Sequence, residues 1–284
     1  MIKYVRRKDL DIKKYNNSIE KSIQSRIYAF SWYLDVVAEN WSVLVVDDYE
    51  TVLPIPFNKK LFLKYITQPY FCQQLGVFSN KIISKDFQKE ILEHIPSKFL
   101  KISLNLNSEN YLLSESSSRI NYTLNLSREY SEIKKDFSKG RKHAVKVGQK
   151  ASLKLIPISI NKLIEIQKNN YSYKIPETKL INLVSIILQK GKGEILGVYK
   201  NEILLGGGFF INDKKRLIYL YSAFNAEGKR QQAASFLISK VIEKNKNTNL
   251  ILDFEGGNLP NIGKFYRSFG AVEEAYSTFN KAFL

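Results

Sequence analysis

Two acidic residues, Asp253 and Glu255, lie at the end of a β-rich run and could serve as a base. Residues 249–254 are predicted to form a strand, and alternate residues of a strand point to the same side. The two carboxylates therefore share one side if the strand persists. A carboxylate at a strand end, near an opening in the sheet, is well placed to remove a proton from an amine. Asp253 could instead cap or close the turn that follows, and the sequence leaves both roles open.

Tyr266 is the candidate for a second proton-transfer group. It lies in a short predicted helix, residues 260–269, that begins at Pro260, a residue suited to a first helical turn. Phe265 and Phe269 are four residues apart and share the face expected to pack on the core. Tyr266 is turned about 100° from Phe265, toward the edge of the helix. The phenol could meet a ligand there, or could simply pack its ring and make a local hydrogen bond.

A basic helix predicted over residues 128–149 carries the first group of candidate anion-binding residues. Gly140 interrupts this helix and could mark a bend or a cap. This group consists of Arg141, Lys142 and Lys146. Lys142 and Lys146 are one turn apart and share a face. The cluster could hold phosphate groups, or it could be an ordinary solvated basic surface.

A second candidate anion site lies at the start of the helix predicted over residues 229–246. Its residues are Lys229, Arg230 and Gln231. The backbone N–H groups of a first helical turn are free to bind anions, and the two cations would assist them. The alternative is a helix start that faces only water.

Other chemistries lack the residues that they need. His94, His143 and the single cysteine, Cys72, lie far apart in the sequence and have no metal-ligand spacing, so no metal site is predicted. A Ser-His-Asp arrangement is equally unsupported. Cys72 could be a nucleophile, but a small buried residue beside Phe71 is the commoner role.

The charge of the chain favours an anionic partner. The 284 residues include 44 Lys and Arg against 27 Asp and Glu, a net charge of +17. Nucleic acid, an anionic membrane surface and a phosphorylated substrate all fit such an excess. A generally lysine-rich surface kept soluble by its charge would give the same composition, so composition does not choose between them.

The sequence predicts a cytoplasmic protein. One cysteine excludes a disulfide within the chain and suits a reducing compartment. No apolar segment of a signal peptide follows the basic N-terminus. No run of about 18 apolar residues occurs, so no transmembrane segment is expected.

The predicted elements form two halves joined by the basic helix. The first half is expected to contain a helix over residues 16–39, broken near residues 28–30 with Ser31 as a plausible N-cap, and a second helix over residues 84–95. Its strands are expected over residues 41–46, 49–56, 99–106 and 120–126. The second half begins with a strand at 153–158 and two helices, 160–171 and 177–190. The stripe expected to face the core in the second helix consists of Leu180, Leu183, Val184, Ile187 and Leu188. The remaining strands and helices are expected over residues 194–199, 203–211, 216–224, 229–246, 249–254, 260–269 and 274–279, with a hairpin turn at Asn201 between the first two.

This order of elements predicts an α/β fold (α+β) with a mixed sheet and helices packed on its faces. The expected domains are residues 1–127, a linking helix at 128–151, and residues 152–284. We expect the late strands of the last domain to lie apart from one another, and the first domain to form a sheet of related topology. Gly206-Gly207-Gly208 lies inside a predicted strand and could mark a bulge or the close approach of a ligand.

Several motifs resemble those of the GNAT acyltransferase superfamily, especially its FemAB-like branch. Residues 265–271, FYRSFGA, resemble a late helix whose Tyr lies four residues before a Gly that opens the last strand. Residues 253–258, DFEGGN, resemble the aspartate–glycine turn of the FemAB-like branch, and residues 141–148, RKHAVKVG, resemble its basic linking helix. Residues 32–35 and 68–76 also resemble uncharacterised bacterial members. The resemblance implies two GNAT-like domains in tandem.

The resemblance also implies a reaction. Fem-type proteins transfer an amino acid from aminoacyl-tRNA to a cell-wall peptide amine, whereas other relatives use acyl-CoA. By this likeness Tyr266 would protonate the leaving group, and Glu255 would act as base through a water. The expected partners are therefore tRNA, CoA or a nucleotide-sugar peptide, with peripheral contact to an anionic membrane as a further candidate.

The sequence departs from the superfamily at the loop that binds the pyrophosphate of CoA. Residues 228–234 read GKRQQAA, and only Gly228 remains of the glycines that let the backbone approach a diphosphate. We therefore expect weak binding of acetyl-CoA and no permanently bound cofactor. The predicted function is transfer of an acyl or aminoacyl group to an amine. The alternative is a non-catalytic protein of the same fold that binds an anionic ligand or RNA.

Overall fold

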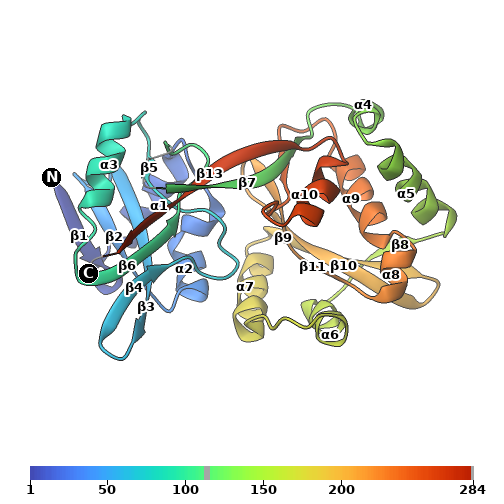
Figure 1. The fold of residues 1–284 in the computed structure, drawn as a ribbon, viewed down its shortest axis with the longest axis horizontal. Coiled ribbons are helices and arrows are strands. Elements are labelled where there is room, and N and C mark those ends of the chain that lie inside the picture. The colour runs from blue at the N-terminus through green and yellow to red at the C-terminus, as the bar shows by residue number, and fades with distance from the viewer. Residues whose placement is uncertain (112–115, 283–284) are drawn as a thin grey trace. The chain divides into compact units, whose positions relative to one another are not determined.

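The computed structural model describes residues 1–111 and 116–282 (Figure 1). The chain forms two compact units. The first comprises Met1–Arg119 and the described part of Ala275–Leu284, and the second comprises Ile120–Glu274. The second unit thus includes the basic segment that we expected to link two domains. The last strand, expected in the second domain, continues into the first unit, because β13 (Val272–Ala282) pairs with β6 (Phe99–Asn105).

The first unit contains a mixed sheet with the strand order β1-β2-β3-β4-β6-β13. Among the described strand pairs of this unit, only β4 and β6 run parallel to each other. Its other elements, in chain order, are β1 (Ile2–Arg6), the 3-10 helix η1 (Arg7–Asp9), α1 (Ile12–Lys21), η2 (Ile27–Ala29), α2 (Ser31–Val37), β2 (Asn40–Val46), β3 (Thr51–Lys60), β4 (Leu63–Thr67), β5 (Phe78–Ser79) and α3 (Lys85–Glu93).

The long helix predicted over residues 16–39 is divided. Asp11 caps α1 by accepting a hydrogen bond from the Lys14 N–H at 3.0 Å, and the chain then leaves the helix before η2 and α2. The predicted break near residues 28–30 corresponds to η2. Phe30, rather than Ser31, is the residue that precedes the first turn of α2.

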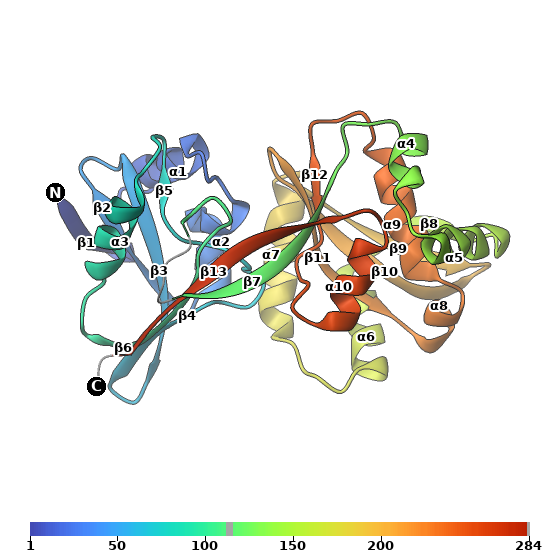
Figure 2. The ribbon, with the colours of Figure 1, turned by 45° about the horizontal axis from the view of Figure 1, so that its top comes forward.

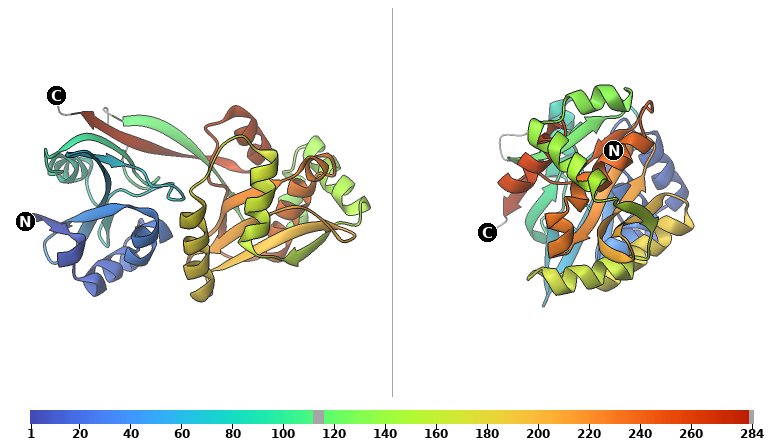
Figure 3. Two further views of the ribbon diagram at one scale, coloured as in Figure 1. Left: turned by 90° about the horizontal axis from the view of Figure 1, so that it is seen from below. Right: turned by 90° about the vertical axis from the view of Figure 1, so that its right-hand side faces the viewer.

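The second unit holds the antiparallel strands β8, β9, β10 and β11, followed by a parallel β12 and an antiparallel β7. Helices α6 and α7 lie on one face of this sheet, and α5 and α9 lie on the other (Figure 3). Its elements are β7 (Ser116–Asn125), α4 (Tyr130–Lys135), α5 (Lys139–Lys150), β8 (Lys154–Pro157), α6 (Ile160–Asn170), α7 (Glu177–Gln189), β9 (Gly193–Lys200), β10 (Ile203–Asn212), β11 (Arg216–Phe224), α8 (Ala226–Arg230), α9 (Ala233–Lys244), β12 (Ile251–Asp253) and α10 (Pro260–Arg267). This confirms the predicted mixed sheet with helices on its faces.

Two predicted helices are each two helices in the structure. The basic segment breaks at residues 136–138, because the Ser138 hydroxyl caps α5 by accepting a hydrogen bond from the Arg141 N–H at 3.2 Å. Gly140, expected to mark the break, lies inside the first turn of α5. The helix predicted over residues 229–246 is divided into α8 and α9 at Gln232, whose φ of 58° is left-handed.

The three glycines of β10 belong to the sheet itself. The pairing of β10 with β9 shifts by one residue between Leu204 and Gly206, and Gly206 has a φ of +149°. A Cβ atom on Gly206 would lie 2.5 Å from the carbonyl oxygen of Ala223 in β11. The glycines therefore permit a bulge and close strand packing, the first of the two predicted roles.

Candidate active site

The candidate site lies in the second unit, where strands β11 and β12 separate. These parallel strands pair only along Arg216–Ile218 and Ile251–Asp253. Beyond that point β11 continues to Phe224 beside β10, whereas the N–H of Phe254 donates to the carbonyl of Tyr122 in β7, at 3.0 Å. The separation predicted for the late strands is thus present here.

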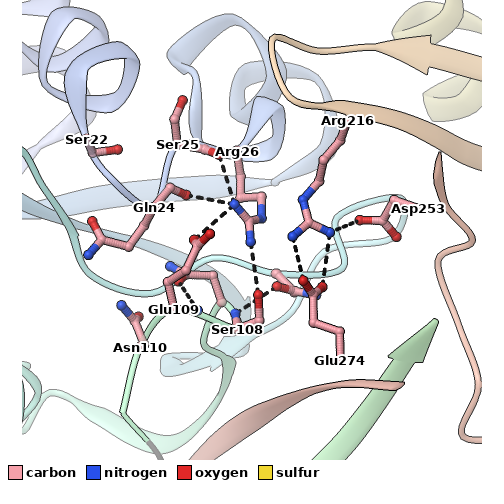
Figure 4. A network of polar contacts seen from close by, with 12 residues as sticks. Ser22, Gln24, Ser25, Arg26, Ser108, Glu109, Asn110, Arg216, Asp253 and Glu274 are labelled. Atoms are coloured by element: carbon pink, nitrogen blue, oxygen red, sulfur yellow. Dashed lines mark hydrogen bonds and ion pairs between the residues drawn. The ribbon is translucent and has the colours of Figure 1, made fainter. Parts of the chain in front are cut away.

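Asp253 ends β12 in a buried ion cluster (Figure 4). Its Oδ2 lies 2.8 Å from a guanidinium nitrogen of Arg216, and its Oδ1 accepts a hydrogen bond from Asn121 at 2.8 Å. Glu274 completes the cluster with oxygens 2.6 Å and 3.0 Å from the same guanidinium. Asp253 is 2% exposed. With both oxygens engaged, this carboxylate is suited to positioning the strand end rather than to acting as a base.

The arginine of this cluster remains charged. Burial disfavours the guanidinium form, but the facing carboxylates of Asp253 and Glu274 outweigh that cost and raise the pKa of Arg216 above its ordinary value. Removing a partner from such a pair leaves an uncompensated buried charge, which is far costlier than the pair itself. The cluster therefore fixes the ends of three strands around the site.

The turn after β12 presents Glu255 in an unusual backbone conformation. Glu255, Gly256 and Gly257 have φ angles of 48°, 143° and 144°. The N–H of Glu255 donates to Asp253 Oδ1 at 3.1 Å, and that of Gly256 donates to Asn121 Oδ1 at 3.2 Å. A left-handed non-glycine residue is uncommon, and such strain concentrates at functional sites. The ion cluster thus holds the turn that aims Glu255.

Tyr266 faces this turn from α10. Its ring stacks on Phe254, with centroids 4.6 Å apart and planes inclined by 25°. Tyr266 is half-buried, whereas Phe269 is fully buried in the core, as the helical spacing predicted. Among the described residues the Tyr266 hydroxyl has no hydrogen-bond partner. Burial, with the nearby Glu255 and Asp253, raises the pKa of Tyr266 above its ordinary value, so the phenol keeps its proton at neutral pH.

A row of further tyrosines lines the open part of β11. Tyr219 and Tyr221 are 6% and 8% exposed. Burial raises the pKa of Tyr219, and the Tyr266 and Tyr171 phenols add to that effect. The Tyr171 hydroxyl accepts a hydrogen bond from the N–H of Phe224 at 3.3 Å and donates one to the carbonyl of Phe224 at 3.2 Å. The Tyr221 hydroxyl is buried without a hydrogen-bond partner among the described residues.

Arg141 is the one predicted cation that the structure places in a shielded setting. Its Nε donates to Ser268 at 2.9 Å, and another guanidinium nitrogen donates to Ser235 in the first turn of α9. The guanidinium lies 4.1 Å and 4.5 Å from the ring centroids of Phe265 and Phe269. Burial lowers the pKa of Arg141 to about 10, which leaves it charged at neutral pH. No carboxylate of the described chain pairs with it.

Arg141 borders a hollow of about 310 Å³. The other lining residues are Gly140, His143, Ala144, Val147, Arg230 and Gln232. Gln232 precedes α9 and makes no side-chain capping bond, so the N–H groups of the first turn remain outside the hydrogen-bond ladder of the helix. A cation without a counter-ion beside a helix N-terminus favours an anionic ligand.

The other five residues predicted to bind an anion are arranged differently. Lys142 donates to the carbonyl of Lys135 at 2.7 Å, and Lys146 is exposed. Lys229 lies over the ring of Tyr171, 4.6 Å from its centroid. Arg230 pairs with Glu227 at 2.6 Å, and Gln231 donates to the same carboxylate at 2.8 Å. Of these five, only Arg230 reaches the hollow beside Arg141.

Sequence reasoning missed the residues that join distant elements. Arg216, Glu274 and Asn121 form the ion cluster, and Tyr171 and Gln232 border the site. Arg216 follows two lysines at the start of a strand, and nothing in that local pattern marks it as buried. The alternation of Tyr219 and Tyr221 with apolar residues was the one available signal for a tyrosine-lined surface.

The described residues hold no metal site or membrane span. Residues 1–111 and 116–282 contain no group of three or more His, Cys, Asp or Glu side chains that could bind a metal ion. None of the helices in those ranges is both long and apolar enough to cross a membrane. Cys72 is buried, 3% exposed, and accepts a hydrogen bond from Gln68 at 3.5 Å.

Comparison with known proteins identifies the fold. No protein-family model and no curated protein gives a significant match to the sequence. Among solved structures, FemX has a TM-score of 0.70 at 10% identity, with 97% of this chain and 96% of FemX covered. A protein of unknown function from Bacteroides thetaiotaomicron has a TM-score of 0.61 at 12% identity, with 99% of this chain and 100% of that protein covered.

A third similar structure is described as a tandem GNAT protein. A tandem GNAT protein from the clavulanic acid biosynthesis pathway has a TM-score of 0.52 at 7% identity, with 99% of this chain and 98% of that protein covered. At such identities a likeness concerns the fold alone. The chain therefore has the mixed α/β fold of FemX and of the tandem GNAT proteins, as its motifs predicted.

Proposed function

We propose that this chain transfers an acyl or aminoacyl group from a phosphate-bearing donor to an amine, and that the second unit carries the reaction. The observation that carries the proposal is Tyr266, a half-buried, protonated phenol beside Glu255 at the point where β11 and β12 separate. In the superfamily that this fold resembles, that edge faces the leaving group of the donor.

The proposed reaction follows from this pair. Glu255, through a water, takes a proton from the ammonium group of the acceptor. The neutral amine attacks the carbonyl carbon of the donor and forms a C–N bond, an oxyanion and a cationic nitrogen, and that nitrogen loses its extra proton to water. The oxyanion then collapses and breaks the bond to the leaving sulfur or ribose oxygen. Tyr266 gives its proton to that atom, and solvent reprotonates the phenolate.

The donor would be anchored by its phosphates near Arg141. The guanidinium has no carboxylate partner in the described chain and borders the first turn of α9, which supports an anion site there. The conventional CoA loop is poorly supported, because the N–H of Gly228 is already bonded to the Asn225 side chain at 2.7 Å. Aminoacyl-tRNA and acyl-CoA both remain donors to be tested, with weak acetyl-CoA binding expected.

A donor assay tests this proposal. Purified protein is incubated with labelled aminoacyl-tRNA or labelled acyl-CoA and a panel of amines, and the labelled amide is measured. We expect transfer from one donor class, slowed by about 10²-fold in Tyr266→Phe and unchanged in Tyr70→Phe, whose tyrosine is 65% exposed in the first unit. Tight binding of a donor without any transfer would contradict the proposal and favour the non-catalytic alternative.

A further inference from the structure

The hairpin between β3 and β4 ends in three exposed apolar residues. Leu61, Phe62 and Leu63 are 86%, 98% and 53% exposed. Figures 1 and 2 show this hairpin extending from the sheet of the first unit. Single exposed apolar residues are normal, but three in a row at a hairpin tip mark a surface that contacts something apolar.

Lysines flank the tip on both strands. Lys59 and Lys60 precede it, and Lys64 follows it. Lys59 and Lys64 lie directly opposite each other in the β3/β4 register, where like charges destabilise a pair of strands. These three lysines form no ion pair with a described residue, and residues 51–85 contain no Asp or Glu. An anionic surface would relieve this repulsion.

A basic hollow lies at the base of the same hairpin. It has a volume of about 460 Å³, and its cationic lining residues are Arg6, Arg7, Lys8, Lys59, Lys64 and Lys98. Asp35 and Glu39 are its only acidic lining residues, and Arg7 pairs with Asp35 at 2.7 Å. Its floor is aromatic, with Trp41 4% exposed and Lys98 Nζ 3.7 Å from the ring centroid of Tyr4. Such a hollow suits a phosphate-bearing headgroup.

We infer that the first unit docks on an anionic phospholipid bilayer through the β3–β4 hairpin. Leu61, Phe62 and Leu63 insert at the boundary between headgroups and acyl chains, and the flanking lysines contact lipid phosphates. A nucleic acid would use the cations but would gain nothing from three exposed apolar side chains. A second copy of this chain would bring its own lysines against these and be repelled. This inference stands apart from the proposed transfer reaction.

Vesicle binding of the full chain tests this inference. Protein is sedimented with vesicles of phosphatidylcholine alone or of phosphatidylcholine with phosphatidylglycerol. We expect binding only to the anionic vesicles, weakened by salt. Phe62→Ser should weaken that binding on the order of tenfold through lost apolar contact. The matched control is Ile203→Ser, which removes a 65% exposed apolar residue from the β9–β10 hairpin and should leave binding unchanged.

The lysines are tested in the same way. The double variant Lys59→Gln/Lys64→Gln should weaken binding by roughly 25-fold, about fivefold for each charge. Lys214→Gln/Lys215→Gln, at the exposed turn before β11, removes the same charge and should have a much smaller effect. Phe62→Trp supplies a direct signal, because insertion would shift its fluorescence to shorter wavelength.

Three results would overturn the inference. They are no binding to anionic vesicles, equal binding by Phe62→Ser and wild type, and a Phe62→Trp emission that vesicles leave unchanged. A concentration-dependent dimer that Phe62→Ser abolishes would instead assign the hairpin to self-association. Because Phe62 is almost wholly exposed, its substitution should leave the fold intact, which thermal unfolding would verify.

Discussion

Replacing Arg216 by Met tests whether the buried ion cluster holds the candidate site together. The substitution leaves Asp253, 2% exposed, without its cation, and leaves Glu274 beside it. Breaking a buried pair by removing one partner costs about 3–5 kcal/mol. For a unit of this size that corresponds to a fall in melting temperature of roughly 6–20 °C.

Denaturant unfolding followed by circular dichroism measures this effect. Arg216→Met/Asp253→Asn, which also removes the stranded charge, should recover part of the lost stability. The control Arg128→Met breaks an exposed pair with Asp136, 2.5 Å apart, and should cost at most about 1 kcal/mol. An Arg216→Met protein within 1 kcal/mol of wild type at pH 8 would refute the reasoning.

Three further predictions concern the site. Arg141→Gln should weaken binding of the anionic donor by about tenfold or more, because it removes a shielded cation that has no carboxylate partner in the described chain. Lys146→Gln, which removes an exposed cation, should change binding little. Calorimetry compares the donor affinities of the two variants. Glu255→Gln should slow transfer by about 10²-fold and abolish the loss of rate at low pH that protonation of a base produces, and an unchanged pH–rate profile would exclude Glu255 as the base. Acetyl-CoA should bind weakly, and tRNA, if it is the donor, should bind with an affinity that falls steeply with salt; micromolar CoA affinity would contradict the first expectation, and salt-independent binding the second.

The fold could be predicted from the sequence where the evidence was local. The stripe of Leu180, Leu183, Val184, Ile187 and Leu188 predicted α7. The first four residues are buried, whereas Leu188, in the last turn, is 43% exposed. The Asn201 turn predicted the β9–β10 hairpin, and Asn201 has the left-handed φ of 52° that such a turn requires. The Ser138 cap was also visible in principle, but Gly140 drew the predicted break two residues too far along the chain.

The long-range arrangement had no such local signal. The Asn121–Asp253 hydrogen bond joins residues 132 positions apart, and pairing at that distance leaves no periodic trace in either segment. The return of β13 to the first unit likewise depends on strand pairing that spans most of the chain. The sequence therefore offered Asp253 as a candidate base, because Arg216, which pairs with its carboxylate, lies on another strand and far away in the chain.

The apolar tip of the β3–β4 hairpin could not be identified from the sequence. No hairpin was predicted over residues 59–64, and only side-chain exposure separates a solvent-facing turn from an apolar tip. Composition had offered an anionic membrane as one candidate partner among several. The 98% exposure of Phe62 is the observation on which we infer a membrane rather than another anionic partner.

The most direct test of the account is a single-turnover measurement on Tyr266→Phe with whichever donor binds. The loss of one hydroxyl from a half-buried ring should leave folding and the donor Kd nearly unchanged. Transfer to the amine should slow by about 10²-fold, the low end for a positioned acid–base group. Wild-type rates in Tyr266→Phe, at equal stability and equal donor affinity, would contradict the proposed role of the phenol and with it the catalytic assignment of the site.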